Sequence, residues 1–136
     1  METSLKHEVL RKWHEIAVSP NPEALDALLA DEAVFHSPVV HTPQRGKALT
    51  AMYLSAAAAV FSTSDFHYVR EVVGERDAAL EFMATVDGIE INGIDLFHWN
   101  EEGRIDDFKV MIRPLKAVNL LHRMMGAMLE QLGPKS

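Results

Sequence analysis

The sequence predicts a single α+β domain in which a curved antiparallel sheet packs against helices on one face. Helical hydrophobic periodicity dominates the first 60 residues, strand-like alternation follows to about residue 112, and a last helical segment closes the chain. With 136 residues, 48% of them hydrophobic, the chain can bury one substantial core but not two. Helices first and antiparallel strands after them favour a layered α+β domain covering residues 1–136, with a cavity on the concave side of the sheet.

Three helices are predicted in the first half of the chain. Apolar residues recur at helical spacing between Ser4 and Val18, which predicts the first helix. A second begins at Pro22, because Asn21 is a favourable N-cap and proline suits the first helical position. The third follows Gly46, where apolar residues form one stripe.

Five segments are predicted as strands. The first is short, Ala33–Ser37, and an irregular loop follows it. The other four form a meander over residues 66–73, 78–86, 89–99 and 104–112. Asp87 and Gly88 predict a type I′ hairpin turn, since both central positions of that turn need a positive φ. We expect Asn92 and Gly93 to form a bulge in the strand that contains them.

The final helix is predicted to start at Pro114. A heptad-like seam, with residues spaced by alternating threes and fours, consists of Leu115, Val118, His122, Met125, Leu129 and Leu132, and Gly133 with Pro134 ends the helix. Three methionines lie near this seam: Met124, Met125 and Met128. The seam either packs on the domain's own sheet, forms a dimer contact, or covers the mouth of the pocket as a lid.

The composition narrows the class of function. A net charge of −7, with 20 acidic and 13 basic residues, argues against nucleic-acid binding, which depends on clustered Lys and Arg. The absence of cysteine excludes disulfides, thiolate zinc sites and Cys nucleophiles. The histidines show no metal-ligand spacing, so we expect no metal site, and the expected reaction class needs no cofactor. With no 18-residue apolar run and no signal-peptide pattern, a cytoplasmic location away from membranes is expected.

Two segments resemble the nuclear transport factor 2-like superfamily, on its branch of SnoaL-like polyketide cyclases and ketosteroid isomerases. DEAVFHSPVVHTPQRG, from Asp31 to Gly46, is similar to the acidic pair, short strand and proline–basic–glycine pattern of these proteins. IDLFHWNEEGRI, from Ile94 to Ile105, is similar to their aspartate–aromatic strand and acidic–glycine–basic turn. The resemblance runs from the first helix to Ile112. It implies a cone-shaped α+β barrel, to which this chain adds a C-terminal helix, and a homodimer.

The resemblance also assigns functional positions, with a mixed result. The catalytic base of ketosteroid isomerases corresponds to Ser37 here, and their helix-one tyrosine corresponds to Trp13. Their second oxyanion donor, an aspartate, is kept as Asp95. The last-strand acid of the cyclases and epoxide hydrolases corresponds to Val110. Only one of the three steroid-isomerase roles is therefore retained.

Asp95 is the strongest candidate catalytic residue on its own chemistry. Strand alternation places it with Phe97 and Trp99 on an aromatic inner face. Burial would raise the pKa of this carboxyl, and the neutral acid could donate a hydrogen bond to a ligand carbonyl or enolate. The alternative is a structural role, in which Asp95 accepts from a backbone amide, a histidine or an indole N–H.

His36 is the second catalytic candidate, as a base paired with Asp95 if its ring points inward. Alternation opposes this, because an inward Ser37 would leave His36 facing away, half-exposed and bonded to the backbone. Ser37 is either a hydroxyl donor in the pocket or the cap of the turn at Pro38.

The remaining candidate ligand contacts are aromatic or apolar residues of the expected inner face: Trp13, Tyr53, Phe97, Trp99, Phe108, Val110 and Ile112. Such residues either line a cavity or fill the core. We infer a hydrophobic pocket for a small apolar or polycyclic molecule with a carbonyl or hydroxyl group. Two interpretations stay open: a cofactor-independent isomerase, cyclase or lyase (dehydratase) that acts by proton transfer, and a non-catalytic ligand-binding or dimeric interaction module of the same fold.

Overall fold

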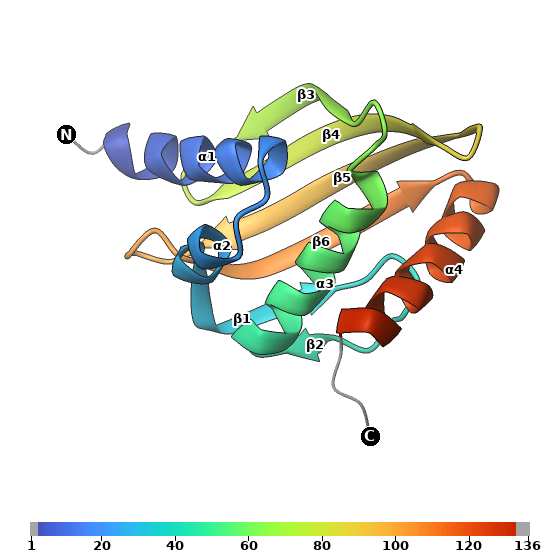
Figure 1. The fold of residues 1–136 in the computed structure, drawn as a ribbon. Helices are drawn as coiled ribbons and strands as arrows, with labels where there is room; N and C mark the ends of the chain where they lie inside the picture. The colour runs from blue at the N-terminus through green and yellow to red at the C-terminus, as the bar shows by residue number, and fades with distance from the viewer. Residues whose placement is uncertain (1–2, 133–136) are drawn as a thin grey trace.

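The computed structural model describes residues 3–132, and within that range four helices lie on one face of a single six-stranded sheet (Figure 1). The helices are α1 (Thr3–Val18), α2 (Pro22–Leu28), α3 (Lys47–Phe61) and α4 (Leu115–Leu132). The strands are β1 (Leu29–His36), β2 (Gln44–Arg45), β3 (His67–Val73), β4 (Asp77–Val86), β5 (Ile89–Trp99) and β6 (Ile105–Arg113). The predicted α+β class, the element order and the four-stranded meander are confirmed.

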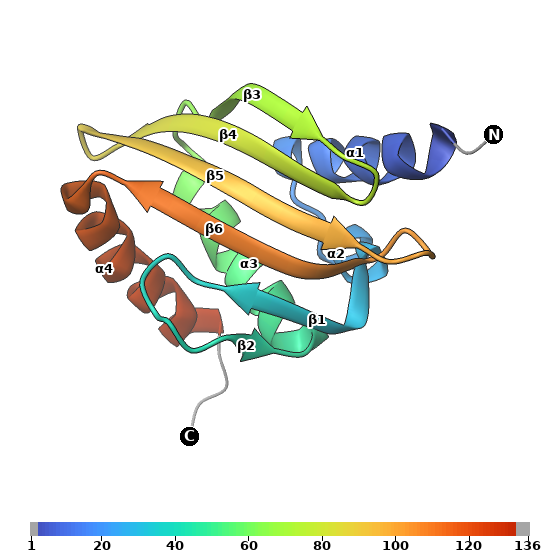
Figure 2. The same cartoon turned by 180° about the vertical axis from the view of Figure 1, so that it is seen from behind.

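The sheet is mixed and open rather than wholly antiparallel. Its strand order is β2-β1-β6-β5-β4-β3, and the two outer strands stay apart, so the curved sheet does not close (Figure 2). All neighbours run antiparallel except β1 and β6. Parallel strands need a crossover, which the segment from α3 to β5 supplies. This arrangement is the cone-shaped fold with an additional C-terminal helix.

Three local expectations about the strands were wrong. β1 begins at Leu29 rather than Ala33, because Leu29 is buried at the end of α2 and already extended. The two-residue strand β2 was predicted as loop, since two residues are too short for alternation to be seen. Asn92 and Gly93 form no bulge: the β4–β5 ladder is continuous there, and the irregularity lies between His98 and Trp99 instead.

The hairpin between β4 and β5 fixes which side chains face the helices. Asp87 and Gly88 have φ values of 51° and 75°, as the predicted type I′ turn requires. The turn pairs Val86 with Ile89, and from there every second residue of β5 is buried. That inward row carries Asp95 in the middle of the strand.

Two groups of buried side chains lie between the helices and the sheet. The aromatic core, which packs against α1 and α3, contains Trp13, Phe35, Phe97, Trp99 and Phe108 among others. The α4 core contains Val60, Phe82, Ile91, Leu120 and Leu121 among others. Along the inward row of β5, the α4 core ends at one side of Asp95 and the aromatic core begins at the other.

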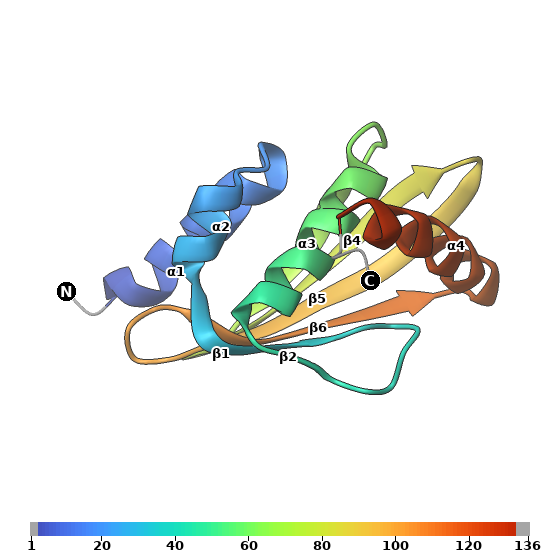
Figure 3. The ribbon, with the colours of Figure 1, turned by 60° about the horizontal axis from the view of Figure 1, so that its bottom comes forward.

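Of the three alternatives for α4, the structure shows packing on the domain itself, with Met124, Met125 and Met128 against the α4 core, but the predicted seam is not the most buried face. Leu115 is 72% exposed and His122 is exposed, whereas Ala117, Leu120 and Leu121 are buried against the domain itself. The helix folds back from β6 across the sheet beside α3 (Figure 3). The face of α4 that packs against the domain is therefore rotated away from the predicted seam. The predicted end at residues 133–134 lies outside the described residues.

No helix within residues 3–132 is both long and apolar enough to span a membrane.

Candidate functional site

Asp95 lies on the inner face of β5, as alternation predicted. Only 7% of its surface is exposed, and it is the one buried charged residue in the part of the chain that the structure describes. Leu80 and Val110 are its direct neighbours on the adjoining strands β4 and β6. A carboxyl in such apolar surroundings needs either a hydrogen-bond donor or a proton.

A chain of two hydrogen bonds connects Asp95 to Tyr68 of β3 and to Trp13 of α1. The indole Nε1 of Trp13 donates to the Tyr68 hydroxyl oxygen over 2.9 Å. The Tyr68 hydroxyl donates to Asp95 Oδ2 over 2.5 Å. Because an indole N–H can only donate, it occupies the phenol oxygen as an acceptor and directs the phenol proton to Asp95.

Burial raises the pKa of Asp95 to about 7, and the hydrogen bond from Tyr68 opposes that rise. The pKa of Tyr68 is raised as well, first by burial and then by the charge of Asp95, so its phenol keeps its proton. Asp95 therefore changes protonation near neutral pH while Tyr68 stays a donor. The hydrogen bond from Tyr68 goes to Oδ2, and no described residue donates to Asp95 Oδ1.

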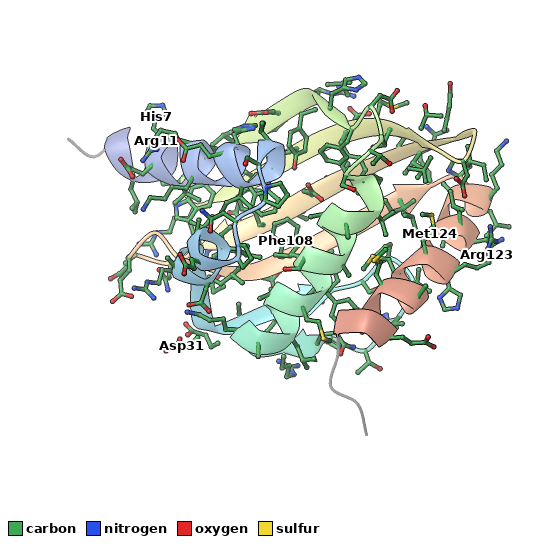
Figure 4. The ribbon with its side chains drawn as sticks, viewed as in Figure 1. His7, Arg11, Asp31, Phe108, Arg123 and Met124 are labelled. Carbon is green, nitrogen blue, oxygen red and sulfur yellow. The ribbon has the colours of Figure 1, made fainter. Side chains whose placement is uncertain are left out.

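The predicted aromatic ligand contacts pack against one another on the helix-covered face of the sheet. Phe97 and Phe108 stack with ring centroids 5.2 Å apart, and Trp13 lies 5.0 Å from Phe108. Phe35 stacks on Tyr53 at 5.1 Å. Phe108 is found between α1 and α3, whereas Met124 lies apart on α4 (Figure 4). These rings fill the aromatic core beside Asp95, and none of them lines the hollow described below.

Trp99 belongs to the same core and carries an indole N–H without a hydrogen-bond partner in residues 3–132. Its side chain is fully buried in the aromatic core, 6.1 Å from the ring of Phe97. Its Nε1 has no hydrogen-bond partner among the described residues. A buried donor in this position costs free energy unless a polar atom reaches it.

Four predicted site residues line a different space, a hollow of about 390 Å³ beside the end of β6. They are His36, Ser37, Val110 and Ile112. Val110 has a double position, because it lines this hollow and is also the cross-strand neighbour of Asp95. Direct cross-strand neighbours have their Cβ atoms about 5 Å apart. Val110 therefore separates the hollow from the carboxyl.

The predicted pair of His36 and Asp95 is not formed. Phe35 is buried on the inner face, so His36 points to the outer face, where its Nε2 lies 2.8 Å from Asp107 Oδ1. Ser37 Oγ accepts from the amides of Val39 and Val40 at 3.0 and 3.2 Å. The capping role was thus the correct interpretation of Ser37, which faces the hollow as well.

Residues 10–108 match the SnoaL-like domain. The chain belongs to this family. It is a branch of the nuclear transport factor 2-like superfamily, as the sequence motifs indicated, and the fold agrees with that of other SnoaL-like and ketosteroid isomerase-like proteins. No curated protein matches the chain.

Two solved structures are similar along nearly the whole SnoaL-like chain. A steroid delta-isomerase from Pseudomonas aeruginosa is 35% identical, with a TM-score of 0.88 over 94% of this chain and 93% of its own. A protein with a cystatin-like fold from Silicibacter pomeroyi DSS-3 is 31% identical, with a TM-score of 0.85 over 96% and 91%. The epoxide hydrolase/cyclase-like enzyme SalBIII is 17% identical, with a TM-score of 0.67 over 85% and 96%, and shares the fold.

Tyr68 is the site residue that sequence reasoning missed. Its strand, β3, is an edge strand whose other described residues are exposed, so no alternation marked an inward position. The available signal was the aromatic spacing of Phe66 and Tyr68, whose rings meet edge to face at 5.2 Å. Elsewhere among residues 3–132, no three His, Cys, Asp or Glu side chains gather as a metal site would require.

Proposed function

We propose that this SnoaL-like protein binds a small, mostly apolar molecule, and that protonated Asp95 donates a hydrogen bond to a carbonyl or hydroxyl oxygen of that molecule. The hydrogen-bond chain from Trp13 through Tyr68 to Asp95 carries the proposal. It occupies Oδ2 of the carboxyl and leaves Oδ1 without a described protein donor. A neutral acid held in this way offers one proton in a fixed direction.

The surroundings of Asp95 support an apolar ligand. Its inward neighbours on β4 and β6 are Leu80 and Val110, and the rings of Phe97 and Trp13 lie in the same core. The hollow next to Val110 has a volume in the usual range of small-molecule sites, about 300 to 1,000 Å³. Because Val110 lines that hollow and is the cross-strand neighbour of Asp95, the ligand is expected to approach from this side.

If the protein is an enzyme, the reaction class is proton transfer without a cofactor, as in isomerisation, cyclisation or dehydration. The 35% identical relative is called a steroid delta-isomerase. Asp95 would stabilise the charge that develops on the carbonyl oxygen, and a pKa near 7 suits a group that gains and loses a proton. The absence of acids at Ser37 and Val110 favours the alternative, a non-catalytic ligand-binding module.

Tryptophan fluorescence can test the proposed hydrogen bond between Asp95 and the ligand, because the indole of Trp13 is part of the hydrogen-bonded series that ends at Asp95. The matched ligands are 1-tetralone, a planar ketone, and tetralin, the hydrocarbon of the same skeleton. We expect saturable binding of the ketone that weakens several-fold between about pH 6 and about pH 8, since a carboxylate cannot donate. Tetralin binding should not depend on pH in this range.

Two substitutions test whether Asp95 donates a hydrogen bond to the ligand or only fills space beside it. Asp95→Asn keeps an N–H donor at every pH, so its ketone affinity should become independent of pH. Asp95→Leu removes the donor, so it should bind 1-tetralone no better than tetralin. Equal binding of ketone and hydrocarbon by the unaltered protein would refute the proposal.

Catalysis is tested separately with a β,γ-unsaturated cyclic ketone. Conversion to the conjugated isomer, followed by its ultraviolet absorbance, should occur with the unaltered protein and stop in Asp95→Leu. Saturable ketone binding without conversion would establish the binding-module alternative.

A further inference from the structure

The hollow beside β6 exists because β1 stops pairing before β6 ends. The last parallel pair is His36 with Lys109, after which the chain leaves the sheet in a loop. Residues of the 36–41 segment form one wall of the hollow, and residues 109–112 of β6 form the other. Since both faces of β6 contribute, the hollow follows the edge of the sheet, where the strand's backbone has no β1 partner.

The polar lining of this hollow is basic, although the protein as a whole carries a net charge of −7. Its nitrogen-bearing side chains are His36, His41 and Lys109, and no carboxylate side chain lines it. His36 is already held by Asp107, at 2.8 Å. Lys109 forms no salt bridge with any carboxylate in the described part of the chain. The hollow thus offers an uncompensated positive charge.

A neutral donor and an apolar surface complete the lining. Ser37 Oγ accepts two backbone amides, so its own proton is free to donate into the hollow. Pro38, Val40, Val110 and Ile112 supply the apolar surface. A ligand that matches both parts has an anionic head and a short hydrocarbon body.

We propose that this hollow binds a small organic carboxylate, with Lys109 and His41 facing the carboxylate and Val110 and Ile112 facing its hydrocarbon part. The inference goes beyond the proposed function, because it requires neither the acid proton of Asp95 nor a ketone. An exposed ion pair contributes little on its own, so the affinity should come from the charge and the apolar contact together.

The test compares hexanoate with hexanamide, which has the same hydrocarbon chain without the charge. Hexanoate added to the ¹⁵N-labelled protein should shift the amide signals of residues 37–41 and 109–112 saturably. Hexanamide should bind more weakly, and added sodium chloride should weaken hexanoate alone, because salt screens the charge. Equal affinity of the two ligands, or shifts confined to other residues, would overturn the proposal.

Matched lysine variants identify the charge. Lys109→Met keeps the length of the apolar side chain and should weaken hexanoate by roughly five- to tenfold, with hexanamide unchanged. Lys116→Met, at an exposed position on α4, is the control and should change neither ligand. If Lys109→Met does not fold, the effect of sodium chloride on hexanoate and hexanamide binding by the unaltered protein still tests whether a charge contributes to binding.

The Asp95→Leu variant separates this inference from the proposed function. Hexanoate should bind it as it binds the unaltered protein, while the ketone response is lost. Loss of hexanoate binding in that variant would place the ligand in the interior and contradict a site at the sheet edge.

Discussion

At the scale of single residues, Asp95 depends on two side chains far from it in the sequence. Trp13 of α1 fixes the direction of the Tyr68 hydroxyl, and the hydroxyl fixes which carboxyl oxygen is free. Burial favours the protonated acid, and the Tyr68 bond favours the ionised one. The balance leaves Asp95 able to change its protonation under ordinary conditions.

Because the pKa of Asp95 is raised in the folded protein, the free energy of unfolding should depend on pH, and Asp95→Asn should remove this dependence. Between the ordinary pKa of 3.8 and the folded value of about 7, the folded protein holds a proton that the unfolded chain has released. The contribution of Asp95 is therefore complete below that window and is lost as the pH rises through it. The free energy of unfolding of the unaltered protein, measured in urea relative to Asp95→Asn, should fall by about 1.4 kcal/mol per pH unit there. A difference that does not vary with pH would mean that Asp95 titrates normally.

Sequence reasoning at this scale succeeded for Asp95 and failed for its partner. Alternation along a central strand with buried neighbours was enough to turn Asp95 inward. Tyr68 lies among exposed valines on an edge strand, and its role depends on α1 crossing near it, which no local pattern encodes. The alternative of a structural hydrogen bond had named an indole as donor to Asp95, and the structure inserts a phenol between the two groups.

At the scale of elements, the inward row of β5 includes one residue without a side chain. Gly93 lies between Ile91 and Asp95 on this row. A Cβ there would lie 2.7 Å from Ile112 Cδ1 and 2.8 Å from the carbonyl oxygen of Met111, and Phe82 Cζ would be closer still. The glycine thus allows Phe82 and Ile112 to close over the strand beside Asp95.

Gly93→Ala should therefore destabilise the protein, by about 1–3 kcal/mol, because a backbone atom and an aromatic ring would have to move. Gly126→Ala is the matched control: it lies exposed within α4, with no atom within 4 Å of an added Cβ. Since alanine is the better helix former, that variant should gain about 0.5–1 kcal/mol. Urea unfolding measures both, and an unchanged midpoint for Gly93→Ala would contradict the packing seen around β5.

The helices and the meander could be predicted because their signals are local. Periodicity, the cap at Asn21 and the turn at Asp87 each involve residues close in sequence, and all were found. The pairing of β1 with β6 and the buried face of α4 depend on contacts between distant segments. For that reason the sheet was expected to be wholly antiparallel, and the seam predicted for α4 does not coincide with the face that the structure buries.

At the scale of the whole molecule, one face of the sheet has no helix over it (Figure 2). Ile94 and Met111 are paired across β5 and β6 on this face and are 37% and 50% exposed. Along β6, the acidic Asp106 and Asp107 stand at one end and Arg113 at the other. A two-fold contact with antiparallel strands would set the acidic end of one copy against the basic end of the other.

The homodimer remains a prediction, and this outer face is where we expect its contact. Ile94→Arg should convert a dimer to a monomer in light scattering, because the charge would lie near the middle of the face. Val18→Arg, at an 85% exposed position at the end of α1, should leave the mass unchanged. A monomeric unaltered protein at the same concentrations would rule out the contact.

The parallel pairing of β1 with β6 also has a consequence for how the chain reaches this structure. The meander from β3 to β6 joins neighbours through short turns, whereas Phe35 must find Phe108 more than 70 residues away. Closing so long a loop costs chain entropy before any contact compensates for it, so the meander can assemble first and β1 joins it late. Because Ser37 and the loop after it hang from β1, the hollow beside β6 takes shape only in that last step of folding.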